Sequence, residues 1–328
     1  MALNEFGKGE FEIKRFLDDY KILYKDVEKY HLAILTPGKE INEFVKTGFG
    51  NPYIPGSSIK GALRTVILWH LIKNSPPDKI NDRLDEILNN PKVKKEQADN
   101  LLDKYLFGKD DKYLFGKEPN YDFLRGLQVG DVEFEIKNLA VEEIRTLTLT
   151  NADNYGWKRW QTFAEVLPLS ESVSSLVNIE IDNFLFEHPK AKGILKFDHK
   201  KGYLTQIPKM CNDYARVFIQ NEIKFFADCK MQPLKKYYEE LLAKIPTDHR
   251  KGVLLHLGWG SGWRGMTGNY LDNQMLRRFR GKFRMGKSIK NPRTGKWEQF
   301  PIFPKTRRIV FRDNQPAYPL GWIMMEEK

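Results

Sequence analysis

The folds open to this chain depend first on the irregular order of its strand-like and helix-like segments. Apolar and polar residues alternate over 124–136, 144–149 and 173–181, and this period of two predicts strands. Apolar residues spaced three and four apart predict a helix from 59 to just before Pro76, and we predict further helices over 213–228, 234–245 and 270–279 and strands over 306–311 and 320–325. Because these elements do not follow a regular βαβ rhythm, the sequence predicts an α+β fold.

The chain has 328 residues, which suits about two domains, and we expect residues 1–140 and 141–328 to form them. Its apolar runs are far shorter than the roughly 20 residues of a membrane-spanning helix, and its N-terminus lacks an apolar signal region. Cys211 and Cys229 form no disulfide framework and no metal-binding pair. We therefore expect a cytoplasmic protein without a bound metal or cofactor.

Positive charge is concentrated in residues 277–312. This segment has thirteen basic residues and one acidic residue, a net charge of +12, whereas the rest of the chain carries −1 of the total +11. Six aromatic residues lie among the basic ones, and cations interleaved with rings are typical of single-stranded nucleic-acid binding. A solvated loop with aromatic anchors is the alternative. The basic residues that we predict to bind RNA here are Arg277, Arg278, Arg280, Lys282 and Arg284.

The sequence PGSSIKGALR at 55–64 is the first motif that suggests a binding site. A glycine and two serines, Ser57 and Ser58, precede the predicted helix, and either serine could cap it. Backbone N–H groups at such a helix start suit a phosphate, and Lys60 and Arg64 share one helix face. The spacing differs from that of a nucleotide-binding P-loop. A capped amphipathic helix with two solvated cations fits the same pattern.

The sequence HLGWGSGWRGMTG at 256–268 is the second motif. It holds five glycines in eleven residues, with Trp259 and Trp263 as stacking surfaces and Arg264 as a cation. Consecutive N–H groups can bind anions, and glycine lets a polymer backbone approach closely. A flexible turn is the alternative interpretation. Together these groups indicate contact with a phosphate chain.

These two motifs, with LFGK, LQVGDVEF and the terminal PLGWIMM, resemble the RAMP superfamily of CRISPR proteins, specifically the Csm (type III-A) effector subunit that caps the guide RNA. The resemblance implies tandem ferredoxin-like (RRM-like) domains with a glycine-rich loop and insertions. It also implies a non-catalytic role in antiviral defence, through binding of the 3′ region of the guide RNA (crRNA) beside neighbouring RAMP subunits. In that family host nucleases are recruited for guide maturation. Carried over position by position, the resemblance implies RNA contacts at Ser57, Ser58, Lys60, Arg64, Gly260, Ser261, Gly262, Trp263 and Arg264. The family's TPxHIGxG-type strand is matched only by LTPGK at 35–39.

Two other functions fit parts of the sequence. A RAMP-type endoribonuclease that processes guide precursor RNA would need a general base, and His256 beside the glycine-rich motif is the best candidate, whereas His70 lies on an apolar helix face. Asp131 is a lone acid and a weak indication of metal-assisted cleavage. A scaffold that binds only proteins would turn the basic segment towards an acidic partner. If the chain binds RNA, we expect it to contact the sugar-phosphate backbone of the RNA without base-specific readout.

Overall fold

A computed structural model describes residues 13–23, 33–34, 40–95, 119–150, 154–167, 173–197 and 200–327. The sequence DKYLFGK occurs at 103–109 and again at 111–117, and both copies lie outside these residues. The LTPGK sequence at 35–39 also lies outside them.

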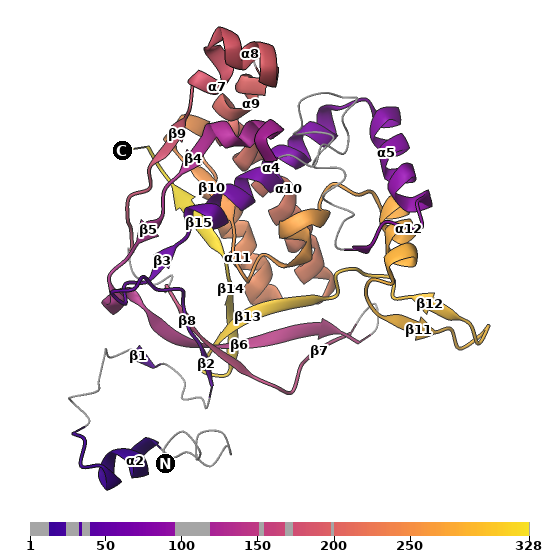
Figure 1. The fold of residues 1–328 in the computed structure, drawn as a ribbon. Helices are drawn as coiled ribbons and strands as arrows, with labels where there is room; N and C mark the ends of the chain where they lie inside the picture. The colour runs from indigo at the N-terminus through magenta and orange to yellow at the C-terminus, as the bar shows by residue number, and fades with distance from the viewer. Residues whose placement is uncertain are drawn as a thin grey trace.

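Strand β6 (Ala140–Leu149) is the centre of the main sheet (Figure 1). On one side it pairs with β13 (Thr306–Arg312), which pairs in turn with β14 (Gln315–Pro319). On the other side it pairs with β8 (Thr162–Val166), followed by β2 (Ile41–Asn42). These pairings are antiparallel except for the parallel pairing of β8 with β2. Two short strands, β1 (Ala33–Ile34) and β7 (Tyr155–Trp157), also pair with β6.

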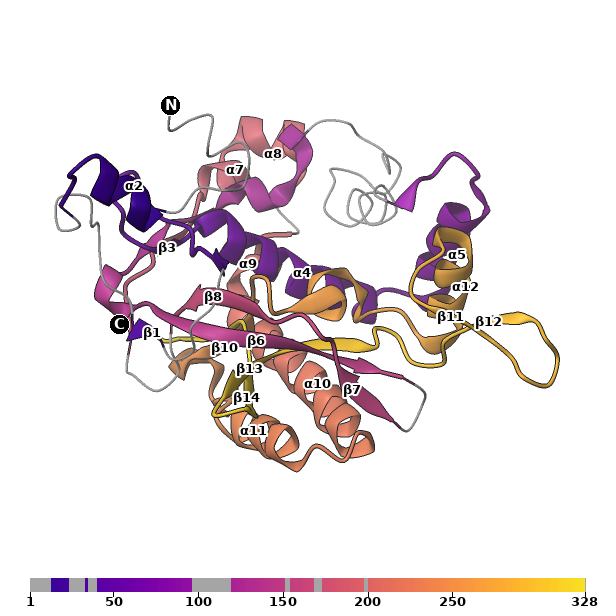
Figure 2. The ribbon, with the colours of Figure 1, turned by 90° about the horizontal axis from the view of Figure 1, so that it is seen from below.

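Helices α10 (Ile207–Asp228) and α11 (Gln232–Ala243) lie side by side below the sheet in Figure 2. They cover the sheet face that carries Leu147, Leu149, Ile309 and Phe311. These four side chains recur at every second residue of β6 and β13, so the period-two pattern of both strands places them on one face. The sheet and the two helices therefore share one apolar core.

A second core forms where α4 (Gly56–Asn74) packs against α10. The predicted stripe of α4 is buried at Ile59, Leu63, Val66 and Ile67. Three further residues of the helix are buried as well, so α4 is covered on more than one face: Leu68, Trp69 and Leu71. Strands β10 (Val253–His256) and β15 (Trp322–Met325) pair with each other and contribute to the same core.

The other elements are short and surround this frame. The helices are α2 (Ile13–Asp19), α5 (Pro77–Asn89), α7 (Phe184–Glu187), α8 (Pro189–Leu195), α9 (Lys201–Thr205) and α12 (Asn273–Phe283). The strands are β3 (Tyr53–Ile54), β4 (Leu127–Val129), β5 (Val132–Glu133), β9 (Ile179–Ile181), β11 (Ser288–Lys290) and β12 (Trp297–Gln299). Single turns of 3₁₀ helix occur at Pro119–Tyr121, Phe123–Gly126, Ile136–Asn138 and His249–Lys251, and a π-helical turn, η7, at Arg264–Gly268.

The predicted α+β class is confirmed, and so are the main helices and strands, with boundary shifts of a few residues. Two predicted strands were too long. Residues 124–136 fold into a 3₁₀ turn, β4 and β5, and within 173–181 only β9 is a strand. The predicted serine cap of α4 was wrong, because the helix already begins at Gly56 and Ser57 and Ser58 lie in its first turn.

Contacts join the chain on both sides of residue 140. Strand β2 pairs with β8, and α4 packs on α10. The division into 1–140 and 141–328 stays a prediction, and these contacts cross it. In the part of the chain that is described, no helix has the length and apolar character needed to cross a bilayer.

The first prediction concerns two glycines of α4. A Cβ at Gly56 would lie 2.2 Å from the carbonyl oxygen of Val129, whereas a Cβ at the exposed Gly61 would meet no atom within 4 Å. We expect Gly56→Ala to lower the free energy of unfolding by about 1–3 kcal/mol through overpacking. Gly61→Ala should raise it by about 0.5–1 kcal/mol, because alanine loses less backbone entropy in a helix. Urea unfolding of both variants measures this, and equal effects would contradict the close packing.

Candidate nucleic-acid interface

The two sequence motifs lie together in the fold. The Thr65 hydroxyl of α4 donates to the carbonyl of Met266 in η7 at 3.0 Å. The Tyr214 hydroxyl of α10 donates to the carbonyl of Arg264 at 3.1 Å, and its ring meets that of Trp69 edge-on at 5.5 Å. The structure therefore brings α4 and the glycine-rich motif to one region of the molecule.

The cations of the first motif have partners within the protein. Lys60 Nζ donates to the carbonyl of Leu127 at 2.7 Å, and Arg64 forms an ion pair with Asp122 at 2.6 Å. Burial lowers the pKa of Lys60, and the Asp122 carboxylate opposes this effect. Ser57 and Ser58 are exposed. Of the four residues predicted to contact an RNA backbone here, the two serines are thus exposed, and the two cations already bind groups of the protein.

Asp131 occupies the helix start that we expected to hold a phosphate. Its carboxylate accepts a hydrogen bond of 2.7 Å from the backbone N–H of Gly56. A negative charge at this position stabilises the positive end of the α4 dipole. Asp131 therefore acts here as a capping residue, supplied from 75 positions along the chain.

The glycine-rich motif uses its glycines for internal packing. A Cβ at Gly260 would lie 2.6 Å from the carbonyl oxygen of Leu320, so the backbones come too close for another residue. Gly262 has a φ of +64°, which favours glycine. Ser261 is buried and donates to the carbonyl of Gly258 at 2.8 Å. These contacts fold the motif onto the segment that precedes β15.

Phe303 links the glycine-rich motif to the basic segment. The Trp263 ring meets the Phe303 ring edge-on at 4.8 Å, and Arg264 donates to the Phe303 carbonyl at 3.3 Å. The Arg280 guanidinium lies over the same ring, 4.9 Å from its centroid. Arg280 is buried in the folded chain, and burial lowers its pKa. Trp263, Arg264 and Arg280 thus stabilise a junction as well as being candidates for RNA contact.

Seven of the thirteen cations in 277–312 interact with groups of the protein. Arg307 makes two hydrogen bonds to Glu222, at 2.6 and 2.7 Å, and Arg312 donates to Glu142 at 3.0 Å. Arg308 lies over the Trp259 ring and donates to its carbonyl. The other four bind a carboxylate or one or more backbone carbonyls: Arg278 with Asp85, Arg280 with Met285, Lys282 with Ile87, Leu88 and Asn90, and Lys305 with Leu149.

The remaining six cations are exposed. They are Arg277, Arg284, Lys287, Lys290, Arg293 and Lys296. Within the described residues, none of their side chains has a hydrogen-bond or ion-pair partner. The last three lie on the hairpin of β11 and β12, or on its turn, and the first two lie on α12 and at its end. We call this set of six the exposed basic surface.

The hairpin of β11 and β12 projects beyond α12 in both ribbon views (Figures 1 and 2). Its turn is specified locally, because the Asn291 side chain accepts from the N–H of Arg293 and Gly295 has a φ of +69°. Trp297 on β12 has 72% of its surface exposed. Of the six aromatic residues in the segment, Phe279, Phe300 and Phe311 are buried, so stacking on a base is most accessible at Trp297.

His256 lies inside the protein. Its ring stacks on Trp322 at 4.2 Å between centroids, and its Nε2 is 2.9 Å from the carbonyl oxygen of Leu320. Burial lowers its pKa to about 4. This location does not present His256 to an RNA strand. In the described ranges, no three His, Cys, Asp or Glu side chains are arranged to hold a metal ion.

The sequence did not reveal the counter-ions of the basic segment. Glu222 lies 85 positions from Arg307, Glu142 lies 170 from Arg312, and Asp122 lies 58 from Arg64. The only available signal was the position of Glu222, which lies among apolar residues of the helix predicted over 213–228, where a buried acid needs a partner. Glu142 lies just before the strand predicted over 144–149 and gave no such signal.

Comparison with known proteins identifies the class. The RAMP superfamily profile matches residues 7–268, most of the chain, so the chain belongs to the RAMP superfamily. CRISPR system Cms protein Csm5 of Methanocaldococcus jannaschii is 27% identical over 289 residues, or 83% of this chain. The match spans 62% of that relative's length. Csm5 of Streptococcus thermophilus is 49% identical over 43 residues, 13% of this chain and 12% of that protein.

Two solved structures are similar in fold. One chain of a cryo-EM structure of a Csm–crRNA–target RNA ternary complex, from a type III-A CRISPR-Cas system, matches with a TM-score of 0.62 and 25% identity. The match covers 88% of this chain and 75% of that one. The crystal structure of T. onnurineus Csm5 matches with a TM-score of 0.55 and 23% identity, over 95% of this chain and 82% of that one.

The second prediction concerns pH. The folded pKa of His256, about 4, lies below the ordinary histidine value of about 6.5. As the pH falls below 6.5, the imidazole of His256 binds a proton in the unfolded chain but stays neutral in the folded chain. The contribution of His256 to the free energy of unfolding is therefore complete above pH 6.5 and declines towards pH 4. Relative to His256→Gln, the wild type should lose about 3 kcal/mol of unfolding free energy between pH 7.5 and 4. Urea unfolding across this range measures the difference, and a difference independent of pH would contradict a neutral buried imidazole.

Proposed function

We propose that this chain is an RNA-binding subunit of a type III-A CRISPR (Csm) effector complex that binds the 3′ region of the guide RNA. The observation that carries the proposal is the exposed basic surface, six cations that have no counter-ion among the described residues, beside the exposed ring of Trp297. Phosphates neutralise such cations, and unstacked bases pack on exposed rings. Support for guide maturation and antiviral defence follows from membership of the complex.

The groups on this surface favour backbone contact over base reading. Arginine and lysine recognise phosphates regardless of sequence, and ring stacking tolerates every base. Asn291, an amide on the hairpin, is engaged in the turn and with Glu298. The proposed subunit therefore holds RNA of any sequence.

The residues of the two motifs have a secondary part in this proposal. Ser57 and Ser58 are accessible, whereas Lys60 and Arg64 would have to exchange Leu127 and Asp122 for phosphates. The segment Gly260–Arg264 is only partly accessible, and the neighbouring Trp259 offers an exposed ring for contact with RNA.

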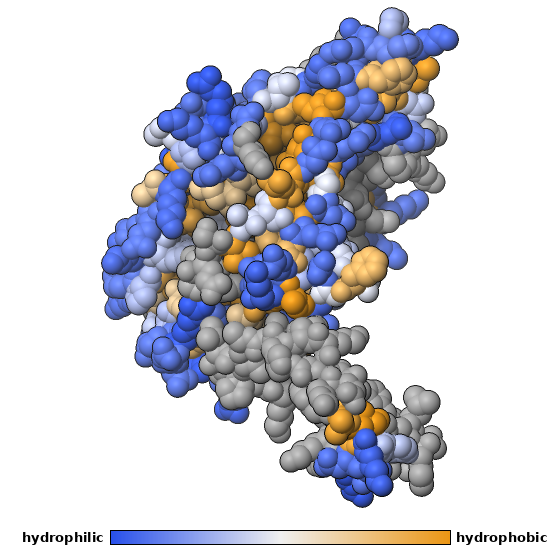
Figure 3. All heavy atoms as spheres, turned by 90° about the vertical axis from the view of Figure 1, so that its left-hand side faces the viewer, coloured by the Kyte–Doolittle hydropathy of each residue, from blue (hydrophilic) through white to orange (hydrophobic). Residues whose placement is uncertain are grey.

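Neighbouring RAMP subunits are the proposed protein partners, and an exposed apolar face supports this. Phe49 is 98% exposed, Leu176 is 67% exposed, and Val45 is exposed as well. The 45–53 turn, β3, β5 and the 175–181 segment are linked in this order by backbone hydrogen bonds and by the Ser175 hydroxyl. Figure 3 views this side, where groups of hydrophobic atoms lie among hydrophilic ones. Large apolar side chains that gather on one exposed face are typical of interaction sites.

The tandem ferredoxin-like plan, with domains 1–140 and 141–328, is part of the proposal. It is supported by a largely antiparallel sheet with α10 and α11 on one face. A non-catalytic role is also proposed, and the burial of His256 favours it over the endoribonuclease alternative. A cytoplasmic location in a prokaryote and recruitment of host nucleases stay predictions.

The third prediction tests RNA binding. The triple variant Lys290→Ala, Arg293→Ala, Lys296→Ala removes three exposed cations of the hairpin. Each phosphate contact to single-stranded RNA contributes about 0.7 to the slope of log affinity against log salt, so the slope should fall by about two. Filter binding of a guide-length RNA between 50 and 200 mM salt measures this.

The matched control is Lys190→Ala, Lys224→Ala, Lys236→Ala, which removes three exposed lysines from α8, α10 and α11. This variant should keep the wild-type slope. An unchanged slope in the hairpin variant, or equal losses in both variants, would refute the proposed surface. No retention of RNA by the wild type would favour a protein-binding scaffold.

A further inference from the structure

A pocket of about 580 Å³ lies between the end of α5 and the end of α12. These two helices share a small core of their own, formed by Ile80, Leu84 and Ile87 of α5 with Met275 and Phe279 of α12. The pocket continues from this core to the surface through Leu88, Val93 and Phe283, which are partly buried against it. Its apolar floor is thus an extension of a packed core.

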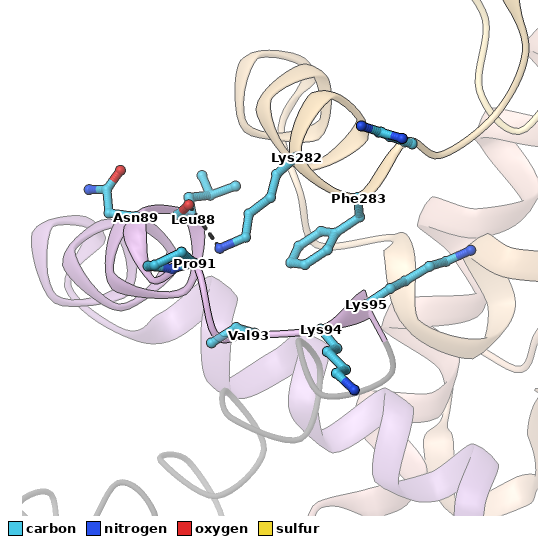
Figure 4. A pocket seen from close by; sticks show the side chains of 9 residues that line it. Leu88, Asn89, Pro91, Val93, Lys94, Lys95, Lys282 and Phe283 are labelled. Atoms are coloured by element: carbon cyan, nitrogen blue, oxygen red, sulfur yellow. Dashed lines mark hydrogen bonds between the residues drawn. The ribbon is translucent and has the colours of Figure 1, made fainter.

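Lys282 fixes the distance between the two helices. Its Nζ donates to the carbonyl of Leu88 at 2.9 Å and to the carbonyl of Asn90 at 2.6 Å. Leu88 lies in the last turn of α5, and Asn90 is the residue after the helix. Figure 4 shows this side chain reaching from α12 to the end of α5. A cation at a helix C-terminus satisfies carbonyls that have no partner in the helix and stabilises the helix dipole. The pocket therefore has a defined width before any ligand enters.

The lining combines apolar walls with cations. The apolar wall is formed by Leu88, Pro91, Val93 and Phe283, and the rim carries Lys94, Lys95, Lys282 and Arg284 together with the amide of Asn89. Among the described residues that line the pocket, none is acidic. In Figure 4 the Phe283 ring faces the space between α5 and the 93–95 segment, whereas the ends of Lys94 and Lys95 point outward.

We infer that this pocket binds one nucleotide of single-stranded RNA, with the base against Phe283 and the flanking phosphates at Lys95 and Arg284. The inference rests on the proposed function, since the nucleotide belongs to the same RNA strand. A volume of about 580 Å³ lies within the range of small-molecule sites, about 300–1,000 Å³. A flat apolar ring inside and cations outside match a base attached to a charged backbone.

An acidic peptide is the main competing ligand, and the geometry favours the nucleotide. Carboxylates would meet the rim cations but would leave the Phe283 ring and the apolar wall without a partner. A nucleotide uses both parts at once, because its base buries the ring while its phosphate remains at the solvated rim.

The experiment uses the full chain and three probes, AMP, adenosine and inorganic phosphate, with binding followed by titration calorimetry. AMP should bind at least about tenfold more tightly than adenosine or phosphate, because it alone engages both ring and cations. Phe283→Leu keeps an apolar side chain but removes the ring, and it should weaken AMP binding about tenfold, the effect of one lost base–aromatic stack. The matched control, Phe49→Leu, makes the same change at an exposed phenylalanine elsewhere and should leave AMP binding unchanged.

Lys95→Glu gives a second test that does not depend on the packing of Phe283, because Lys95 is exposed. It should weaken AMP binding about fivefold and leave adenosine binding unchanged. Wild-type affinity for AMP in both variants would overturn the inference. Two other results would also overturn it. One is inorganic phosphate that binds as tightly as AMP, and the other is a polyglutamate peptide that displaces AMP at a concentration below the Kd of AMP.

Failure of the pocket proposal can be distinguished from failure of the proposed function. The hairpin variant Lys290→Ala, Arg293→Ala, Lys296→Ala should bind AMP as the wild type does while its salt slope for long RNA falls. Retention of long RNA without AMP binding would overturn the pocket alone. AMP binding without retention of long RNA would overturn the proposed function alone.

Discussion

Burial of α10 on two sides is the constraint on which the rest of the structure depends. Met210, Tyr214 and Phe218 belong to the core shared with α4, whereas Ile219 and Phe226 belong to the core shared with the sheet. Each such side chain stabilises the fold by about 1.5–3 kcal/mol when it is fully buried. Because one helix serves both cores, α4 from the first part of the chain and β13 from the last part are held against the same element.

The same helix determines how much of the positive charge is available for binding. Glu222 on α10 is buried and binds Arg307 of β13 through both carboxylate oxygens. Removing one partner of such a pair leaves an uncompensated buried charge and costs about 3–5 kcal/mol. Arg307 therefore belongs to the frame of the protein. Arg308 and Arg312 are similarly engaged on the opposite face of the sheet.

The division of the basic segment into engaged and exposed cations connects the fold to the proposed function. The engaged cations hold α12, the sheet and the glycine-rich motif in place. Arg280, for example, lies over the ring of Phe303, whose carbonyl accepts from Arg264 of the motif. The exposed basic surface and the pocket beside Phe283 lie near one another along the chain, and this fixed frame holds both in position. Within the part of the chain that is described, neither feature has an acidic partner, and both offer an aromatic ring, which is why they suit the same class of polymer.

Much of the fold followed from local pattern. The three-and-four spacing on α4 predicted a helix that the structure contains, and alternation in 144–149 and 306–311 predicted β6 and β13. These predictions succeeded because periodicity reports which side of an element is buried, and that depends on near neighbours in sequence. The length of the 173–181 strand was overestimated, because a strand also needs a partner along its whole length, and only β9 has one in β4.

The sequence by itself determined the α+β class, the position of the two motifs and the concentration of thirteen cations in one segment. Only the tertiary structure decided which of those cations are occupied. Arg307 is neutralised by an acid 85 positions away and Arg312 by one 170 positions away, whereas Lys290, Arg293 and Lys296 extend on a hairpin into solvent. The physical reason is that ion pairing depends on distance in space, which the order of residues along the chain does not fix.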